Sequence, residues 1–177
     1  MKHFFTADEH YEHKNIIKYC DRPFHNKKEM RETLISNHNE VVSFSDIVYH
    51  IGDFTYLPTQ ETLKLIDRLN GKHVFIRGSH DYWMGKRDYP MRVETKINKQ
   101  QIVMDHYPMS SWRWSYHGSW QLHGHWHFSG NVRKNRINIC VDNTDFYPLE
   151  FDQIQEMIKN QKFKVDEQTE WDEVGRK

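Results

Sequence analysis

Thirteen histidines stand among the 177 residues of the chain, and several of them lie in short clusters with aspartate. Imidazole nitrogens and carboxylate oxygens bind divalent transition metals, and histidine is also the side chain that titrates nearest neutral pH. Five such clusters follow directly on predicted strands or polar turns. They are Asp8-x-His10, Gly52-Asp53, Gly78-Ser79-His80-Asp81, Asp105-His106-Tyr107-Pro108 and Gly124-His125-Trp126-His127.

Each cluster is ambiguous on its own. A Gly-Asp pair is most often a turn, and a single histidine is most often a polar residue with ordinary hydrogen bonds. The alternation of His125 and His127 places both rings on one face of an extended segment by strand periodicity alone. The occurrence of all five clusters in one chain is what favours a metal site.

The elements that would position these clusters alternate between strand and helix in the first half of the chain. Short apolar runs predict strands at residues 2–7, 46–52 and 73–77, and helical spacing predicts helices at 26–42 and 58–69. After Pro90, further strands are predicted at 93–97, 101–105, 119–122 and 136–141, with a closing helix at 149–159. This rhythm predicts an α/β fold with a second, mixed or antiparallel sheet and sites at the strand ends.

Composition narrows the class of protein. Lys plus Arg and Asp plus Glu both number 25, so no global positive field recruits nucleic acid. No apolar run approaches the ~20 residues of a membrane span, and the N-terminal apolar stretch is too short for a secretory signal. Cys20 and Cys140 form no C-x-x-C pair or disulfide framework. We expect a cytoplasmic protein with one domain at residues 1–161 and a charged tail at 162–177.

In their order, the five clusters resemble the motifs of the calcineurin-like metallophosphoesterase family, which read D-x-H, G-D, G-N-H-[DE], H and G-H-x-H. The matches run from Asp8 to His127. Ala7-Asp8-Glu9-His10, followed by His13-Lys14-Asn15-Ile16-Ile17, is similar to the small single-domain bacterial and phage members. The resemblance implies a four-layer α/β/β/α sandwich with two central mixed sheets and the metal site at the strand ends.

The resemblance also implies two divalent metal ions, with Asp53 as the carboxylate that bridges them. The remaining ligands that it implies are Asp8, His10 and His127 for the first ion and His106, His125 and Ser79 for the second. Mixed carboxylate and imidazole ligands suit manganese, our first expectation, and also iron, zinc, cobalt and nickel.

The implied reaction is hydrolysis of a phosphodiester or phosphomonoester. Two cations clamp the phosphate and activate a bridging water as a hydroxide nucleophile, with Asp53 between them. His80 matches a histidine of the family that is not a ligand and that assists the leaving oxygen, a step suited to a general acid. We expect a small phosphorylated substrate, with a nucleotide or an RNA end favoured.

Two departures from the family pattern bear on function. Ser79 stands where the family has asparagine, so a side-chain amide oxygen is replaced by a shorter hydroxyl at the second metal. Phe54-Thr55-Tyr56 follows Gly52-Asp53 in place of the longer G-D-x-x-D-R-G block of Ser/Thr protein phosphatases. A protein-phosphatase role is therefore disfavoured. A weakened metal-dependent binding or scaffold protein, and a nuclease of the same family, remain alternatives.

Several residues have weaker claims. His13 and Asn15 match the H-x-N of small family members and could touch substrate, although Asn15 could equally begin a helix. Arg77 could present its guanidinium to phosphate or be solvated at a strand end. The aromatic residues between His106 and His127 could stack on a nucleobase or fill the core and wall the cleft. His50 is expected to be a packed core histidine.

Overall fold

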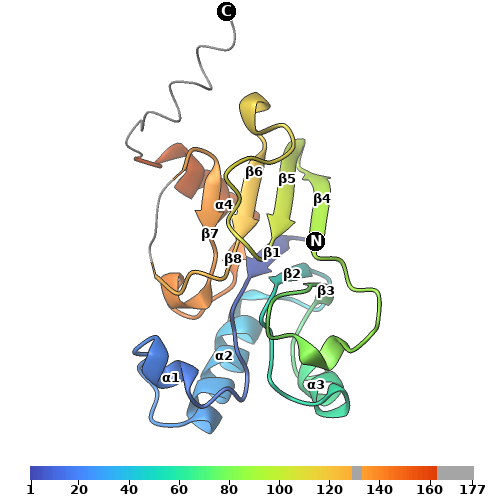
Figure 1. Cartoon of the computed structure of the whole chain (residues 1–177), viewed down its shortest axis with the longest axis vertical. Coiled ribbons are helices and arrows are strands. Elements are labelled where there is room, and N and C mark those ends of the chain that lie inside the picture. The colour runs from blue at the N-terminus through green and yellow to red at the C-terminus, as the bar shows by residue number, and fades with distance from the viewer. Residues whose placement is uncertain (129–132, 163–177) are drawn as a thin grey trace, which may run out of the picture.

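The predicted strands pair into two four-stranded sheets (Figure 1). The computed structural model describes residues 1–128 and 133–162. The strand order in the first sheet is β3 (Lys72–Ile76), β2 (Ile47–Ile51), β1 (His3–Thr6) and β8 (Leu149–Glu150). Strands β1, β2 and β3 are parallel, whereas β8 runs antiparallel to β1.

The second sheet is also mixed. Its strand order is β4 (Arg92–Ile97), β5 (Gln100–Asp105), β6 (Trp120–His123) and β7 (Arg136–Asn138). Strand β4 is antiparallel to β5, and β5, β6 and β7 are parallel. The prediction of an α/β fold with two central mixed sheets is therefore confirmed.

Apolar side chains from both sheets form one core cluster. The first sheet supplies Phe5 and Ile51, and the second supplies Met104 and Leu122, all of which are fully buried. Burial of large aliphatic and aromatic side chains is the main stabilising term of such a core, at roughly 1.5–3 kcal/mol for each one. The two sheets are thus joined by a continuous apolar interior.

Four α-helices occur in the described residues: α1 (Ile16–Tyr19), α2 (Lys27–Val41), α3 (Thr59–Ile66) and α4 (Phe151–Lys159). Figure 1 shows α1, α2 and α3 on the side of the first sheet away from the second. Helix α2 begins at Asn26, whose side chain accepts hydrogen bonds from two backbone N–H groups of the first turn. Helix α4 adds Phe151 and Ile154 to the cluster between the sheets.

Some predicted boundaries differ from the structure. The strand expected at 136–141 ends at Asn138, after which the chain makes a single bridge from Cys140 to Ala7 and enters the 3-10 helix η3 (Val141–Asn143). The closing helix starts at Phe151 because the two residues before it pair with β1. Of the charged tail predicted at 162–177, only Lys162 falls within the described residues.

Three tryptophans at or near the segment between His106 and β6 lie in the core or on the outer surface, and not where a nucleobase would stack beside the clustered histidines. Trp112 is buried, and its Nε1 donates to the carbonyl of Ser119 at 3.2 Å. Trp120 is also buried and stacks on Phe151 of α4. Trp114, about half exposed, precedes the N-terminal end of β6, opposite the end where the clustered histidines lie. These tryptophans therefore serve the core and the outer surface.

Candidate metal centre

The carboxyl ends of five strands converge on one region. Strands β1, β2 and β3 are parallel, as are β5 and β6, so the chain leaves each sheet at a common edge. Hydrogen bonds join the two edges. The backbone N–H of His125 donates to Asp8 Oδ2 at 2.9 Å, and Nδ1 of His106 lies 3.0 Å from the carbonyl oxygen of Ile51. Side chains from both sheets therefore face one another.

Tight turns aim these side chains inward. Asp8, His10, Asp53 and His125 all have positive φ values, between 51° and 67°. Such left-handed conformations are uncommon outside glycine and cluster at functional sites. Strained backbone at four neighbouring predicted ligands indicates that the direction of their side chains is maintained at a cost in stability.

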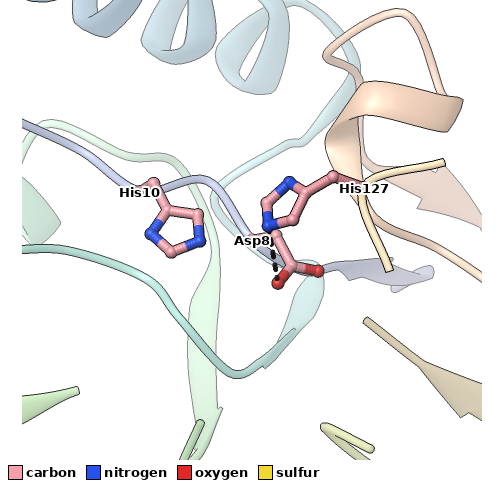
Figure 2. Close-up of side chains that lie close together, drawn as sticks. All are labelled: Asp8, His10 and His127. Carbon is pink, nitrogen blue, oxygen red and sulfur yellow. Dashed lines mark ion pairs between the residues drawn. The ribbon is translucent and has the colours of Figure 1, made fainter. Parts of the chain in front are cut away.

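The first group of donors consists of Asp8, His10 and His127. One possible ligand atom from each lies within 4.8 Å of the others. Figure 2 shows the three side chains together, with the contact between His127 Nε2 and Asp8 Oδ1, 3.8 Å long, drawn as a dashed line. These are the three residues predicted to complete the first metal site.

The second group consists of Asp8, Asp53 and His106, with the same spacing limit of 4.8 Å. Oδ2 of Asp53 lies 3.4 Å from His106 Nε2 and 3.7 Å from His10 Nε2. Asp53 thus faces histidines of both groups, and Asp8 belongs to both. Two carboxylates between two sets of imidazoles form the arrangement that two neighbouring cations require.

The donor set fits divalent cations. Asp8, His10, Asp53 and His106 are each at most 2% exposed. Nδ1 of His106 contacts the carbonyl of Ile51 at 3.0 Å, whereas its Nε2 is buried without a hydrogen-bond partner. A buried imidazole nitrogen without a hydrogen bond is costly unless it binds an ion. Its position beside two carboxylates suits a metal.

The charges are tightly coupled. Burial raises the pKa of Asp8 to about 7, although His106 and His127 partly offset this effect. Burial alone would lower the pKa of His106, but Asp53 and Asp8 raise it to about 9. Burial would raise the pKa of Asp53, yet contact with His106 and the N–H of His80 hold it below its ordinary value. The carboxylates of Asp53 and Asp8 thus favour a positive charge on His106.

The loop after β3 brings Ser79 and His80 to Asp53. The Ser79 hydroxyl donates to Asp53 Oδ2 at 3.0 Å, and the His80 backbone N–H donates to Oδ1 at 2.7 Å. Asp81 holds this loop by accepting backbone hydrogen bonds from Asp53 at 2.8 Å and Gly78 at 2.7 Å. Oδ1 of Asp81 also accepts from the backbone N–H of Phe54 at 2.9 Å and from Nε1 of Trp83 at 3.0 Å, so both oxygens of this carboxylate secure the loop.

Two of the other predicted site residues lie beside the donor groups, and two do not. His125 lies beside the second donor group, with its ring 5.1 Å from that of His106. His13 lies beside the first, with its ring 5.4 Å from that of His10. Asn15 is exposed at the start of α1 and makes no side-chain cap. Arg77 donates to the carbonyl of Gly85 at 2.9 Å and so secures a loop.

The sequence did not predict the two residues that support His127. The Nδ1 of this histidine contacts Asp142 Oδ2 at 2.7 Å, and Asp142 forms an ion pair with the buried Arg22. Neither residue lies in a recognisable motif, and they are far apart in the chain. The only signal was position, since Asp142 closely follows a predicted strand.

The comparisons agree with this geometry. The model of the calcineurin-like phosphoesterases matches residues 1–173. The uncharacterized protein MJ1445 of Methanocaldococcus jannaschii is 37% identical over 169 residues, covering 91% of this chain and 93% of that protein. The structure of AQ665, a protein of unknown function from Aquifex aeolicus, shares the fold with a TM-score of 0.71 at 22% identity, covering 89% of this chain and 99% of that one.

The chain therefore belongs to the calcineurin-like phosphoesterase family, which comprises metal-dependent phosphoric ester hydrolases. The family uses divalent metals, and both donor groups are formed by residues of the predicted motifs. Among the described residues, no helix is long and apolar enough to cross a membrane.

Proposed function

We propose that the chain is a dinuclear phosphoesterase that hydrolyses a phosphodiester or phosphomonoester and favours nucleotide-like substrates. The observation that carries this proposal is the pair of donor groups that share Asp8. Asp53 supports it, because one of its oxygens lies within 4 Å of histidines from both groups. A carboxylate in that position is suited to bridging two cations.

The residues of the chain divide the chemistry between them. When bound, divalent cations neutralise phosphate charge and activate a water molecule for attack. His80 is anchored to Asp53 through its backbone, and its ring lies 5.6 Å from that of His10. From this position the imidazole can donate a proton to the leaving oxygen as the ester bond breaks. Ser79 supports Asp53 through its hydroxyl.

A cluster of rings favours an aromatic group in the substrate. The ring of Tyr56 stacks on His13 with 4.1 Å between centroids and on His80 with 5.3 Å. Tyr56 is 38% exposed, and Tyr82, beside His80, is 75% exposed. Stacking of a base on such rings contributes roughly 1–3 kcal/mol. A nucleotide or an RNA end is therefore our preferred substrate.

The expected metals follow from the donor atoms, and the expected compartment follows from the cysteines. Two carboxylates with imidazoles suit manganese, with iron, zinc, cobalt and nickel as alternatives. Cys20 and Cys140 are free thiols, which favours a reducing compartment such as the cytoplasm.

The test is an activity panel on protein stripped with a chelator. Mononucleotides, cyclic nucleotides and bis-p-nitrophenyl phosphate are assayed without metal and with added Mn²⁺, Zn²⁺ or Mg²⁺. We expect hydrolysis to depend on metal, to be best with Mn²⁺ and to be faster for nucleotides than for phosphoesters without an aromatic group.

The variant Asp53→Asn serves as the control for the dinuclear assignment. Asparagine tolerates the positive φ at this position, but a neutral amide cannot bridge two cations as a carboxylate does. Turnover should be lost and metal content reduced. Two tightly bound ions with normal turnover in this variant would disprove the dinuclear centre.

A further inference from the structure

His127 is held from both sides of its ring. Its Nε2 faces Asp8 Oδ1 at 3.8 Å within the first donor group, and its Nδ1 lies 2.7 Å from Asp142 Oδ2. An ionised carboxylate only accepts hydrogen bonds, so this contact places the proton on Nδ1. The lone pair is then left on Nε2, the nitrogen that faces the donor group.

Asp142 is in turn fixed by Arg22. The guanidinium forms a bidentate pair, with Nε donating to Oδ1 at 2.7 Å and NH2 donating to Oδ2 at 2.8 Å. The Arg22 side chain is fully buried, and that of Asp142 is 6% exposed. Bidentate pairs of this kind fix orientation as well as contribute energy.

The same guanidinium also holds the segment that carries the other ligands. NH2 of Arg22 donates to the carbonyl of Asp8 at 2.7 Å, and NH1 donates to that of Glu9 at 3.0 Å. One buried side chain therefore links the backbone at Asp8 to the support of His127. Two ligands from different sheets are oriented by a single group.

We infer that Asp142, held by Arg22, is a positioning residue that selects the Nε2 ligand form of His127 and fixes its ring against Asp8. The inference rests on the proposed metal centre and goes beyond it, because neither Asp142 nor Arg22 belongs to the family motifs described above. Carboxylates behind metal-binding histidines commonly set the tautomer and raise the basicity of the ligand nitrogen.

A direct metal-binding role for Asp142 is less consistent with the contacts. Cys20, His127 and Asp142 do place donor atoms within 4.8 Å of one another. However, both oxygens of Asp142 already accept from the guanidinium of Arg22, whose positive charge would oppose a cation there. The carboxylate is thus committed to orienting its neighbours.

Substitution of Asp142 by asparagine tests the inference. The amide nearly preserves shape, but it must present N–H hydrogens to Arg22 or to His127, both of which are donors. We expect Mn²⁺ affinity, measured by calorimetry, to fall by roughly 10- to 100-fold. Asp46→Asn is the matched control, because Asp46 is also buried and accepts backbone hydrogen bonds from Lys2 and Ser43. It should leave Mn²⁺ affinity unchanged.

A second measurement needs no variant. Nitrogen-15 NMR of the chelator-treated protein at pH 8 should show the proton of neutral His127 on Nδ1, and Asp142→Asn should shift protonation toward Nε2. Predominant Nε2–H in the natural sequence would overturn the inference, as would equal Mn²⁺ affinity in Asp142→Asn. Failure of the natural protein to bind any divalent metal would instead reject the proposed dinuclear function, and the tautomer measurement would still decide the role of Asp142.

Discussion

At the scale of single residues, the backbone conformation of the proposed metal ligands limits which residues can replace them. Asp8, His10, Asp53 and His125 hold left-handed conformations, which cost roughly 1–2 kcal/mol each for residues with a side chain. Asparagine and aspartate adopt this region more readily than most residues. Asp→Asn variants therefore separate the loss of charge from the loss of backbone geometry better than alanine variants do.

We predict that His80→Ala retains its metals but loses turnover by about 10²- to 10⁴-fold, the usual contribution of a general acid. The loss should be greatest for esters with poor leaving groups, because those need the proton most. The measurement is turnover across a series of phenyl-substituted diesters, alongside metal content.

The matched control is His117→Ala, since His117 is exposed in the short 3-10 helix before β6, at the opposite end of this strand from the clustered histidines. Its turnover should equal that of the natural protein. If His80→Ala loses activity equally for good and poor leaving groups, His80 binds phosphate and does not act as an acid.

Ser79 is the residue at which the chain departs from its family. Its hydroxyl donates to Asp53 Oδ2 at 3.0 Å. An asparagine carbonyl reaches about one bond further and binds metal as a pure acceptor. We predict that Ser79→Asn strengthens the second metal site and raises turnover at limiting Mn²⁺, by up to ~10- to 100-fold. Superimposable curves of turnover against Mn²⁺ for the two proteins would contradict this prediction.

At the scale of elements, local patterns were enough to find most strands and three helices. Apolar runs such as residues 46–52 predict a buried strand. Asn26, followed by apolar residues at helical spacing, predicts α2. Boundaries that depend on distant pairing could not be found in this way. Helix α4 was expected from residue 149, but Leu149 and Glu150 pair with β1, which no local pattern reveals.

The candidate site also contains residues that the sequence predicted and residues that it could not predict. Donors that directly follow a strand, such as Asp8 and His106, could be named from the sequence because strand ends carry sites. Asp142 and Arg22 could not, since their role depends on a contact between segments that lie 120 positions apart. Asp8 was expected in one donor group and belongs to both, which only the three-dimensional arrangement reveals.

The turn after β6 provides a test at this scale. Gly124 lies so close to Asp8 that an added Cβ would collide with Oδ2 and lie 2.7 Å from the Cβ of Ala7. We predict that Gly124→Ala destabilises the fold by ~1–3 kcal/mol and weakens Mn²⁺ binding, because Asp8 must move. Denaturant unfolding and metal titration measure the two effects.

Gly118→Ala is the appropriate comparison. Gly118 has a φ of +83° but open space around it, so alanine there meets only the conformational cost of roughly 1–2 kcal/mol. This variant should lose stability and retain its Mn²⁺ affinity. Equal Mn²⁺ affinity in both variants would show that the turn at Gly124 adapts without disturbing Asp8.

At the scale of the whole molecule, buried histidines make stability depend on pH. His38 is 4% exposed, and its Nε2 lies 2.8 Å from the carbonyl of Asn70. Burial lowers the pKa of His38 from 6.5 to about 3, with the neighbouring His50 adding to the effect. The unfolded chain therefore binds a proton between these pH values that the folded chain does not, and acid favours unfolding.

We predict that His38→Gln, which keeps a donor for Asn70 but cannot titrate, removes the part of this dependence that comes from His38. Between pH 6 and 4, the free energy of unfolding of the natural protein should fall more steeply than that of the variant, by ~1.4 kcal/mol per pH unit. Above pH 7 the two slopes should agree. Parallel curves throughout the acid range would show that His38 is protonated in the fold.

Strand β1 lies between β2, from the first third of the chain, and β8, from near the end of the described residues. One edge pairs with β2, and the other pairs with β8 and with Cys140 beside Ala7. During synthesis, the second edge stays open until the chain has passed residue 150, and closing so long a loop is slow. The candidate metal centre, which extends from the end of β1, should therefore form late on the ribosome. A chain that stalls before residue 149 would expose the edge of β1 that pairs with β8, and an unpaired strand edge can pair with other chains.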